Sequence, residues 1–229
     1  MPSAFDRDTL ALAVLEGYFA PILEGRLEVT IEGPNGSHVL SQESYAQVVD
    51  ALSRTLTDDE ALKSIARVRA YVSLAASVRA GTVQRVVLPA CPADKPQWTD
   101  EMVTEASAKD MRAVLDSGGT LVVTATVTVR PKSGAAITAQ FNCFVRSEPD
   151  LFERPCFIRE DLIIPNVKAD KVNGLICIVR IENGALATLL GDAEGPAHTE
   201  WHAKSRNFDG KYTFGSMMIG FVSNFAGQL

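Results

Sequence analysis

Two stretches of alternating apolar and polar residues, separated by a short turn, constrain the fold of this chain more than any other feature. Apolar side chains recur at every second position over residues 121–129 and again over 137–145, with mainly threonine, asparagine and glutamine between them. Residues 131–134, Pro-Lys-Ser-Gly, have the composition of a turn. A period of two is typical of strands with one buried face. The pattern therefore predicts an antiparallel hairpin that a second layer covers on one side.

Helical patterns dominate the part of the chain before this hairpin, and extended patterns dominate the part after it. The first expected helix covers 8–24, and Pro21 should bend or end it. The next two helices should begin after caps at Ser41 and Thr57. Two more are expected at 100–116 and 216–229. The expected strands lie in a hairpin over 27–40 with its turn at 34–36, and at 86–88, 157–164 and 175–181, the last of which is apolar on both faces and suits a central strand.

These elements indicate the α+β class, because the strands cluster with antiparallel connections instead of alternating with helices. We expect a helix-rich α+β region over 1–118 and, over 119–229, an antiparallel hairpin with a central strand and a closing helix. The two regions could also form one domain, since the only boundary signal is the Gly-Gly pair at 118–119.

Charge and hydropathy exclude some classes of partner. The chain has 229 residues and a net charge of −6, whereas proteins that mainly bind nucleic acid need a basic face. No apolar run approaches the ~20 residues of a membrane span. The first residues lack the basic region and apolar core of a signal peptide, so we expect a cytoplasmic protein. None of the 4 cysteines is spaced as CxxC, the usual zinc or redox spacing.

Chemically active side chains concentrate in residues 191–202, Gly-Asp-Ala-Glu-Gly-Pro-Ala-His-Thr-Glu-Trp-His. The first interpretation is a structural corner, in which Asp192 and Glu200 accept backbone hydrogen bonds and Trp201 anchors the turn. The corner would comprise Gly191, Asp192, Glu194, His198, Glu200 and Trp201.

The second interpretation is a metal site. His198 and His202 are four residues apart, and a helix that begins at Pro196 would place both imidazoles on one face, with Asp192 or Glu194 as a third ligand. The order is H-x-E-x-H, not the H-E-x-x-H of zinc proteases. The alternative function is therefore a metal-dependent hydrolase that uses the two histidines and a nearby acid.

Motifs for other kinds of catalysis are missing. The sequence has no phosphate-binding G-x-x-x-x-G-K-[ST] loop, no dinucleotide fingerprint and no G-x-S-x-G nucleophile turn. We therefore expect no catalysis by this chain on its own, and no cofactor bound by it.

Several segments resemble a known family. Residues 157–161 (Phe-Ile-Arg-Glu-Asp), 186–194, 196–201 and 207–212 resemble the C-terminal region of large bacterial Hsp90-like ATPases, which belong to the histidine-kinase-like ATP-binding class. Residues 13–19, followed by residues 25–29, look like the segment that follows the ATP-binding lobe in that family.

The resemblance implies a chaperone-like bacterial protein in which ATP and magnesium bind only to an upstream domain that precedes this chain. This region would then be a non-catalytic coupling and interaction part that packs on the ATPase lobe, on a separate protein partner or on its own copy. Arg154 and Arg159 lie in a loop rich in charges, which leads to the hypothesis that one of them contacts a nucleotide phosphate in the full-length protein.

Overall fold

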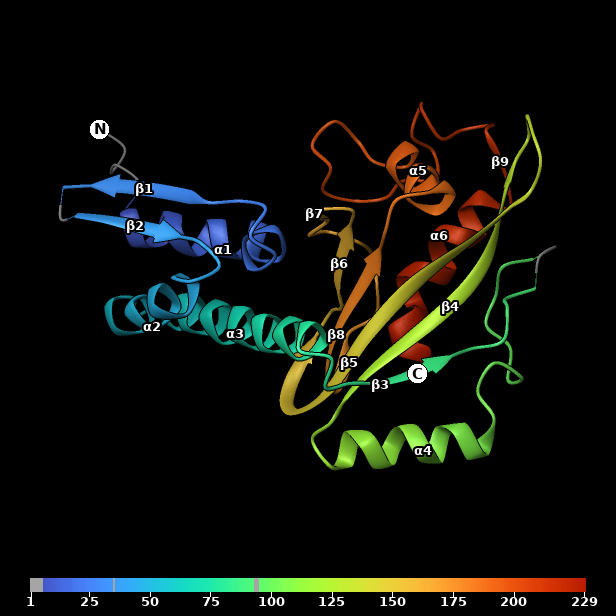
Figure 1. Cartoon of the computed structure of the whole chain (residues 1–229). Helices are drawn as coiled ribbons and strands as arrows, with labels where there is room; N and C mark the ends of the chain where they lie inside the picture. Colours follow the sequence, from blue (N-terminus) through green and yellow to red (C-terminus); the bar gives the residue numbers. More distant parts are fainter. Residues whose placement is uncertain (1–5, 35, 93–94) are drawn as a thin grey trace. The chain divides into compact units, whose positions relative to one another are not determined.

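The chain forms two compact units, residues 1–76 and 77–229, and each is described by itself. The computed structural model describes residues 6–34, 36–92 and 95–229 (Figure 1). Helices and strands are both abundant, so the predicted α+β class is confirmed. The elements are α1 (Arg7–Leu23), β1 (Val29–Gly33), β2 (Gly36–Leu40), α2 (Tyr45–Thr55), α3 (Asp59–Arg79), β3 (Gln84–Val87), α4 (Glu105–Asp116), β4 (Thr120–Pro131), β5 (Ile137–Glu153), β6 (Cys156–Arg159), β7 (Leu162–Ile163), β8 (Val172–Ile181), α5 (Ala185–Asp192), β9 (Tyr212–Thr213), α6 (Gly215–Asn224) and a final 3-10 turn (Phe225–Gln228).

The first unit contains the predicted hairpin and a bent first helix. β1 and β2 pair antiparallel, from Val29 opposite Leu40 to Gly33 opposite Gly36; Asn35 of the predicted turn lies outside the described residues. α1 is interrupted at Tyr18, whose φ and ψ of −141° and 16° are not helical. Proline lacks an N–H and its ring clashes with the preceding turn. The predicted bend near Pro21 is therefore confirmed, three residues before the proline.

The next two helices begin slightly later than predicted, and at the second of them a different residue forms the cap. α2 begins at Tyr45, and Ser41 contributes as predicted: its hydroxyl accepts from the Ser44 N–H at 3.3 Å and its backbone oxygen accepts from the Tyr45 N–H at 3.0 Å. At α3 the carboxylate of Asp58, and not the hydroxyl of Thr57, accepts from the Ala61 N–H at 2.8 Å. Asp is a strong N-cap residue, since its oxygen reaches the unpaired N–H groups of the first turn.

A seven-stranded sheet organises the second unit, with the order β3-β4-β5-β8-β6-β7 and with β9 paired to the far end of β4. β4 and β5 pair antiparallel from Thr120 opposite Arg146 to Val129 opposite Ile137, which confirms the predicted hairpin. β8 lies between β5 and β6, as predicted for a central strand. The boundary expected at 118–119 falls between α4 and β4, inside this unit.

The sheet of the second unit contains the antiparallel hairpin that the sequence predicts, but the sheet as a whole is mixed. β3 pairs parallel with β4, and β6 pairs parallel with β8. The strand predicted over 157–164 is divided into β6 and β7 by a turn at Glu160, whose φ is +56°. Both parallel pairs join segments far apart in the sequence, so no local pattern indicates them.

The main core lies between one face of this sheet and the helices α5 and α6 (Figure 1). Alternate residues of β4, β5 and β8 point into it, and the closing helix predicted over 216–229 is confirmed as α6 and the final turn. Phe141 meets Phe221 and Phe225 edge-on, with ring centroids 6.2 and 4.9 Å away. Such aromatic contacts add to the stabilisation from area burial alone. Among the described residues, no helix combines the length and apolar character needed to cross a membrane.

Candidate functional site

The segment that concentrates the polar chemistry, residues 191–202, forms a tight reversal of the chain. α5 ends at Asp192, and Glu194 then pairs with Trp201 in an isolated antiparallel bridge. The His202 N–H donates to the Ala193 oxygen at 2.7 Å, which holds the two sides of the loop together. His198 lies at the tip with a φ of +51°. The helix predicted from Pro196 is therefore wrong, because a chain that reverses within six residues cannot also form helical turns.

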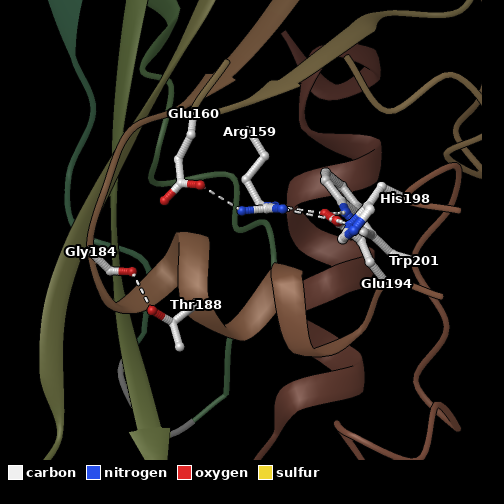
Figure 2. A network of polar contacts seen from close by, with 7 residues as sticks. All are labelled: Arg159, Glu160, Gly184, Thr188, Glu194, His198 and Trp201. Carbon is white, nitrogen blue, oxygen red and sulfur yellow. Dashed lines mark hydrogen bonds and ion pairs between the residues drawn. The ribbon is translucent and has the colours of Figure 1, made fainter. Parts of the chain in front are cut away.

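Glu194 lies at the centre of the contacts in this segment (Figure 2). Its side chain is 0% exposed, and it forms a two-point ion pair with Arg159: Nε donates to Oε1 at 2.6 Å and Nη2 to Oε2 at 2.9 Å. The Trp201 Nε1–H donates to Oε1 at 3.2 Å, and the His198 Nδ1 lies 2.7 Å from Oε2. Every lone-pair direction of the buried carboxylate thus has a donor within the protein.

These hydrogen-bond donors determine the charge state of the Glu194 carboxyl group. Burial alone raises the pKa of Glu194, but hydrogen bonds from Arg159, His198 and Trp201 outweigh burial and hold that pKa below its ordinary value. The hydrogen bond to Glu194 is likewise the main cause of a raised pKa at Arg159. The pair is therefore fully ionised at neutral pH.

The ionised carboxylate also fixes the proton of its histidine partner. A carboxylate only accepts hydrogen bonds, so Nδ1 of His198 must be the donor. Nε2 is then the nitrogen with the lone pair whenever the ring is neutral, and the side chain is 53% exposed. His198 therefore has one nitrogen committed to the interior and one left for solvent.

The guanidinium of Arg159 is held from several sides. Its remaining Nη1 donates to Glu160 at 2.9 Å, and its side chain is only 10% exposed. It lies against Gly191 in α5, where an added Cβ would be 3.4 Å from the guanidinium carbon. In the same helix the Thr188 hydroxyl donates to the Gly184 oxygen at 3.1 Å (Figure 2). Arg159, predicted to contact phosphate, is thus bonded to two carboxylates of its own chain.

Arg154, the other arginine of that hypothesis, is placed differently. Its Nε donates to the Ala169 oxygen at 3.1 Å, and its side chain lies near the surface. The two arginines are therefore not gathered into one site.

The other acids of the segment have partners of their own. Asp192 accepts from the Lys211 amine at 2.9 Å and from the Tyr212 hydroxyl at 2.7 Å, not from the backbone donors that the corner interpretation expects. Burial, together with this bond to Asp192, raises the pKa of Tyr212. Glu200 pairs with Nε2 of His202 at 2.7 Å on the surface.

The predicted metal ligands are thus directed at different partners: His198 at Glu194, His202 at Glu200 and Asp192 at Lys211 and Tyr212. Over residues 6–34, 36–92 and 95–229, no three His, Cys, Asp or Glu side chains are grouped so that they could hold a metal ion. Residues 191–202 therefore make contacts of the kind expected for a structural corner, whereas His198 and His202 are not directed at one common site.

Comparisons of this chain with protein-family models, with curated proteins and with solved structures give no match.

A second buried polar cluster, in the first unit, was not anticipated from the sequence. Asp8 in the first turn of α1 accepts from Arg7 and lies 2.8 Å from Nε2 of His38 on β2. Burial raises the pKa of Asp8, but hydrogen bonds from Thr55, His38 and Arg7 outweigh it and lower that pKa to about 2. The cluster ties α1 to the hairpin and to α2. Its only sequence signal is an acid at a helix start, which is common at exposed positions too.

Proposed function

We propose that this chain is a non-catalytic coupling and interaction region, similar to the part downstream of an Hsp90-like ATP-binding domain. It would pack on an ATPase lobe or on a separate protein partner. The observation that carries the proposal is the fully buried carboxylate of Glu194, which accepts from Arg159, Trp201 and His198. The most chemically dense part of the sequence uses its central acid for internal structure.

The physical reason is access. A catalytic carboxylate must reach a substrate proton or a reacting atom, whereas the Glu194 side chain has no exposed surface. The contacts join two elements of the fold. Arg159 at the end of β6 is hydrogen-bonded to Glu194 in the loop that follows α5, and the ring of Phe157, in the same strand, packs edge-on against the Trp201 ring at 5.4 Å. Because these contacts hold β6 and the loop together rigidly, they support a role in which this region transmits or receives contacts with another domain or protein.

The test is the native form of the polypeptide, measured with an antibody against this chain in its source cells. We expect a product far above 24.7 kDa that hydrolyses ATP after purification. In that product, Glu194→Gln should change the hydrolysis rate, because it loosens the fastened loop, while Glu200→Gln on the surface should not. A native product of 24.7 kDa that purifies without any ATPase would refute the coupling role.

The second candidate is the metal-dependent hydrolase, and one observation favours it. Histidines that bind metals usually donate their other ring nitrogen to a carboxylate or carbonyl, which is how His198 is held by Glu194. His202 and Asp192 would have to leave their present partners to complete the site. Calorimetric titration with zinc tests this candidate, using His198→Ala as the control. Binding no tighter than ~10 μM, or binding that is equal in the variant, would reject it.

A further inference from the structure

The first helix, α1, carries apolar residues on its exposed side as well as on its buried side. The hairpin β1–β2 and α2 pack against α1, and Leu12 and Leu15 are buried on its inner side (Figure 1). On the opposite side Leu10 is 40% exposed, Ala13 is exposed and Val14 is half-buried. A helix that is apolar on all sides is normally covered on all sides. The exposed side of α1 therefore has the composition of a contact surface.

The residues on this exposed side carry no charge. Between Asp8 and Glu24 the sequence has a single charged residue, Glu16, and its carboxylate accepts from Arg67 of α3 at 2.5 Å. Copies of a protein with a net charge of −6 repel one another in general. An uncharged apolar surface is the part of such a protein on which a second copy can lie without that repulsion.

Gly17 leaves a gap on the same side of the helix. Leu10, Val14 and Gly17 are spaced as i, i+4 and i+7, so they lie in line on one helix face. The backbone of Gly17 is helical, and an added Cβ would meet no atom of the described residues within 4 Å. Glycine weakens the interior of a helix. Neither backbone conformation nor packing within this chain therefore requires glycine here, and the gap is open to a side chain from outside.

Leu10 and Gly17 are complementary in shape, as a protruding side chain and a gap. They lie about two helical turns apart on the same face. If a second α1 runs antiparallel, with a two-fold axis between Ala13 and Val14, Leu10 of each copy falls over Gly17 of the other. A two-fold dimer requires this reciprocity, in which residue i contacts residue j and residue j contacts residue i.

We propose that α1 forms the contact of a two-fold homodimer, in which the two α1 helices pair antiparallel and Leu10 of each copy fills the gap above Gly17 of the other. The dimer goes beyond the proposed contact with an ATPase lobe or a separate partner and does not depend on it. One helix from each copy makes a small interface, so we expect a dissociation constant of about 1–100 μM.

A substitution at Gly17 separates association from folding, and sedimentation equilibrium measures the association. The wild-type chain should pass from a monomer of 24.7 kDa to a dimer over about 1–300 μM. Gly17→Gln fills the gap with a good helix former, so the melting temperature should stay equal or rise while the dissociation constant increases by about tenfold or more. Gly220→Gln, at an equally open glycine of α6, is the control and should dimerise like the wild-type chain.

A charge placed on the exposed side of α1 should also separate the copies. Leu10→Glu brings two carboxylates to an uncharged contact and should raise the dissociation constant by about tenfold or more. Val39→Glu is the matched control, because Val39 of β2 is 39% exposed. Its neighbour His38 points to Asp8 of α1, so Val39 points away from α1 by strand alternation. This variant should dimerise like the wild-type chain.

Engineered cysteines test the antiparallel register. A mixture of Leu10→Cys and Gly17→Cys chains, oxidised with diamide, should give a disulfide-linked dimer. Neither variant alone should do so, because equal positions of the two copies lie about 10 Å apart along the helix pair, beyond the reach of a disulfide. The 4 cysteines of the chain itself are buried and do not compete.

The inference fails if the wild-type chain stays monomeric up to about 300 μM, or if Gly17→Gln and Leu10→Glu dimerise like the wild-type chain. It also fails if Val39→Glu is as disruptive as Leu10→Glu, or if Leu10→Cys chains cross-link as well alone as in the mixture. A monomeric wild-type chain that binds phosphatidylcholine vesicles through Leu10 would replace the second copy by a membrane surface. Since these assays need no ATPase, their failure would leave the coupling role untouched.

Discussion

Replacing Glu194 by glutamine removes the charge of the buried carboxylate and keeps the shape of the side chain. In the wild-type protein Glu194 is 0% and Arg159 is 10% exposed, so the arginine cannot turn to water when its partner becomes neutral. Its remaining ionic partner, Glu160, is 43% exposed and attracts it more weakly through solvent. The variant thus leaves a buried cation that is only partly compensated.

The size of the effect follows from that geometry. Breaking a buried ion pair from one side costs about 3–5 kcal/mol of unfolding free energy. For a protein of this size each kcal/mol shifts the melting temperature by about 2–4 °C, so we expect a decrease of about 6–20 °C. Calorimetry and urea unfolding at pH 7 measure both quantities.

The pH dependence has a definite sign. The pKa of Glu194 in the folded protein lies below its ordinary value of 4.5, so the unfolded chain takes up the proton first as the pH falls. The stability that the charge contributes is complete above that ordinary pKa and is lost as the pH falls through the lower folded value. The difference between the wild-type protein and Glu194→Gln should therefore be constant near neutral pH and should shrink in acid.

Glu200→Gln is the matched control, because Glu200 pairs with His202 at the surface and such pairs contribute at most about 1 kcal/mol. A paired variant, Arg159→Met with Glu194→Leu, should recover much of the lost stability, since it removes both charges together. If Glu194→Gln were as stable as Glu200→Gln, the ion pair would not be what fastens the loop.

Three further predictions concern other contacts. Trp201→Ala should cost about 3–5 kcal/mol because the indole is buried, and an unchanged urea midpoint would contradict the anchoring role. Asp8→Asn should cost about 2 kcal/mol at pH 7, because the folded pKa is about 2 against 3.8 ordinarily; the cost should disappear as the pH falls from 4 to 2, which urea titrations at both pH values check. Gly215→Ala should destabilise by about 1–3 kcal/mol, since its Cβ would lie 2.6 Å from Phe208, whereas Gly220→Ala in the same helix meets nothing within 4 Å and should be neutral or stabilising by about 0.5–1 kcal/mol.

The parts of the fold that the sequence predicted are those in which neighbours along the chain settle the structure. The alternation over 121–145 specifies a hairpin because strand period, turn residues and pairing all lie within one short segment. The bend of α1 near Pro21 is predictable for the same reason. The parallel pairings of β3 and β6 are not, because each depends on a partner strand beyond a long connection.

In the candidate site, too, the features set by neighbouring residues could be predicted and those set by distant residues could not. Residues 191–202 stand out by composition, and the buried Trp201 and Glu194 agree with a corner. The sequence does not indicate which of the acids Asp192, Glu194 and Glu200 is the central one. That depends on Arg159, which lies 35 residues before Glu194 in the sequence and pairs with it only in the folded chain. The predicted helix over the histidines failed because their spacing is also compatible with a loop that reverses at His198.

The pairing of β8 has a consequence for which changes of chain length this protein tolerates. β8 runs antiparallel to β5 and parallel to β6, and the Glu160 N–H next to Arg159 donates to its last residue, Ile181, at 2.7 Å. Deleting one residue within β8 would turn Cys177 and Val179 out of the core and also displace the arginine from its carboxylate. A single substitution in this strand affects one side chain at a time. An insertion or deletion, in contrast, breaks the hydrogen-bond ladders to β5 and β6 and the Arg159–Glu194 ion pair together. Natural variation in length should therefore avoid β8, even where its individual residues vary.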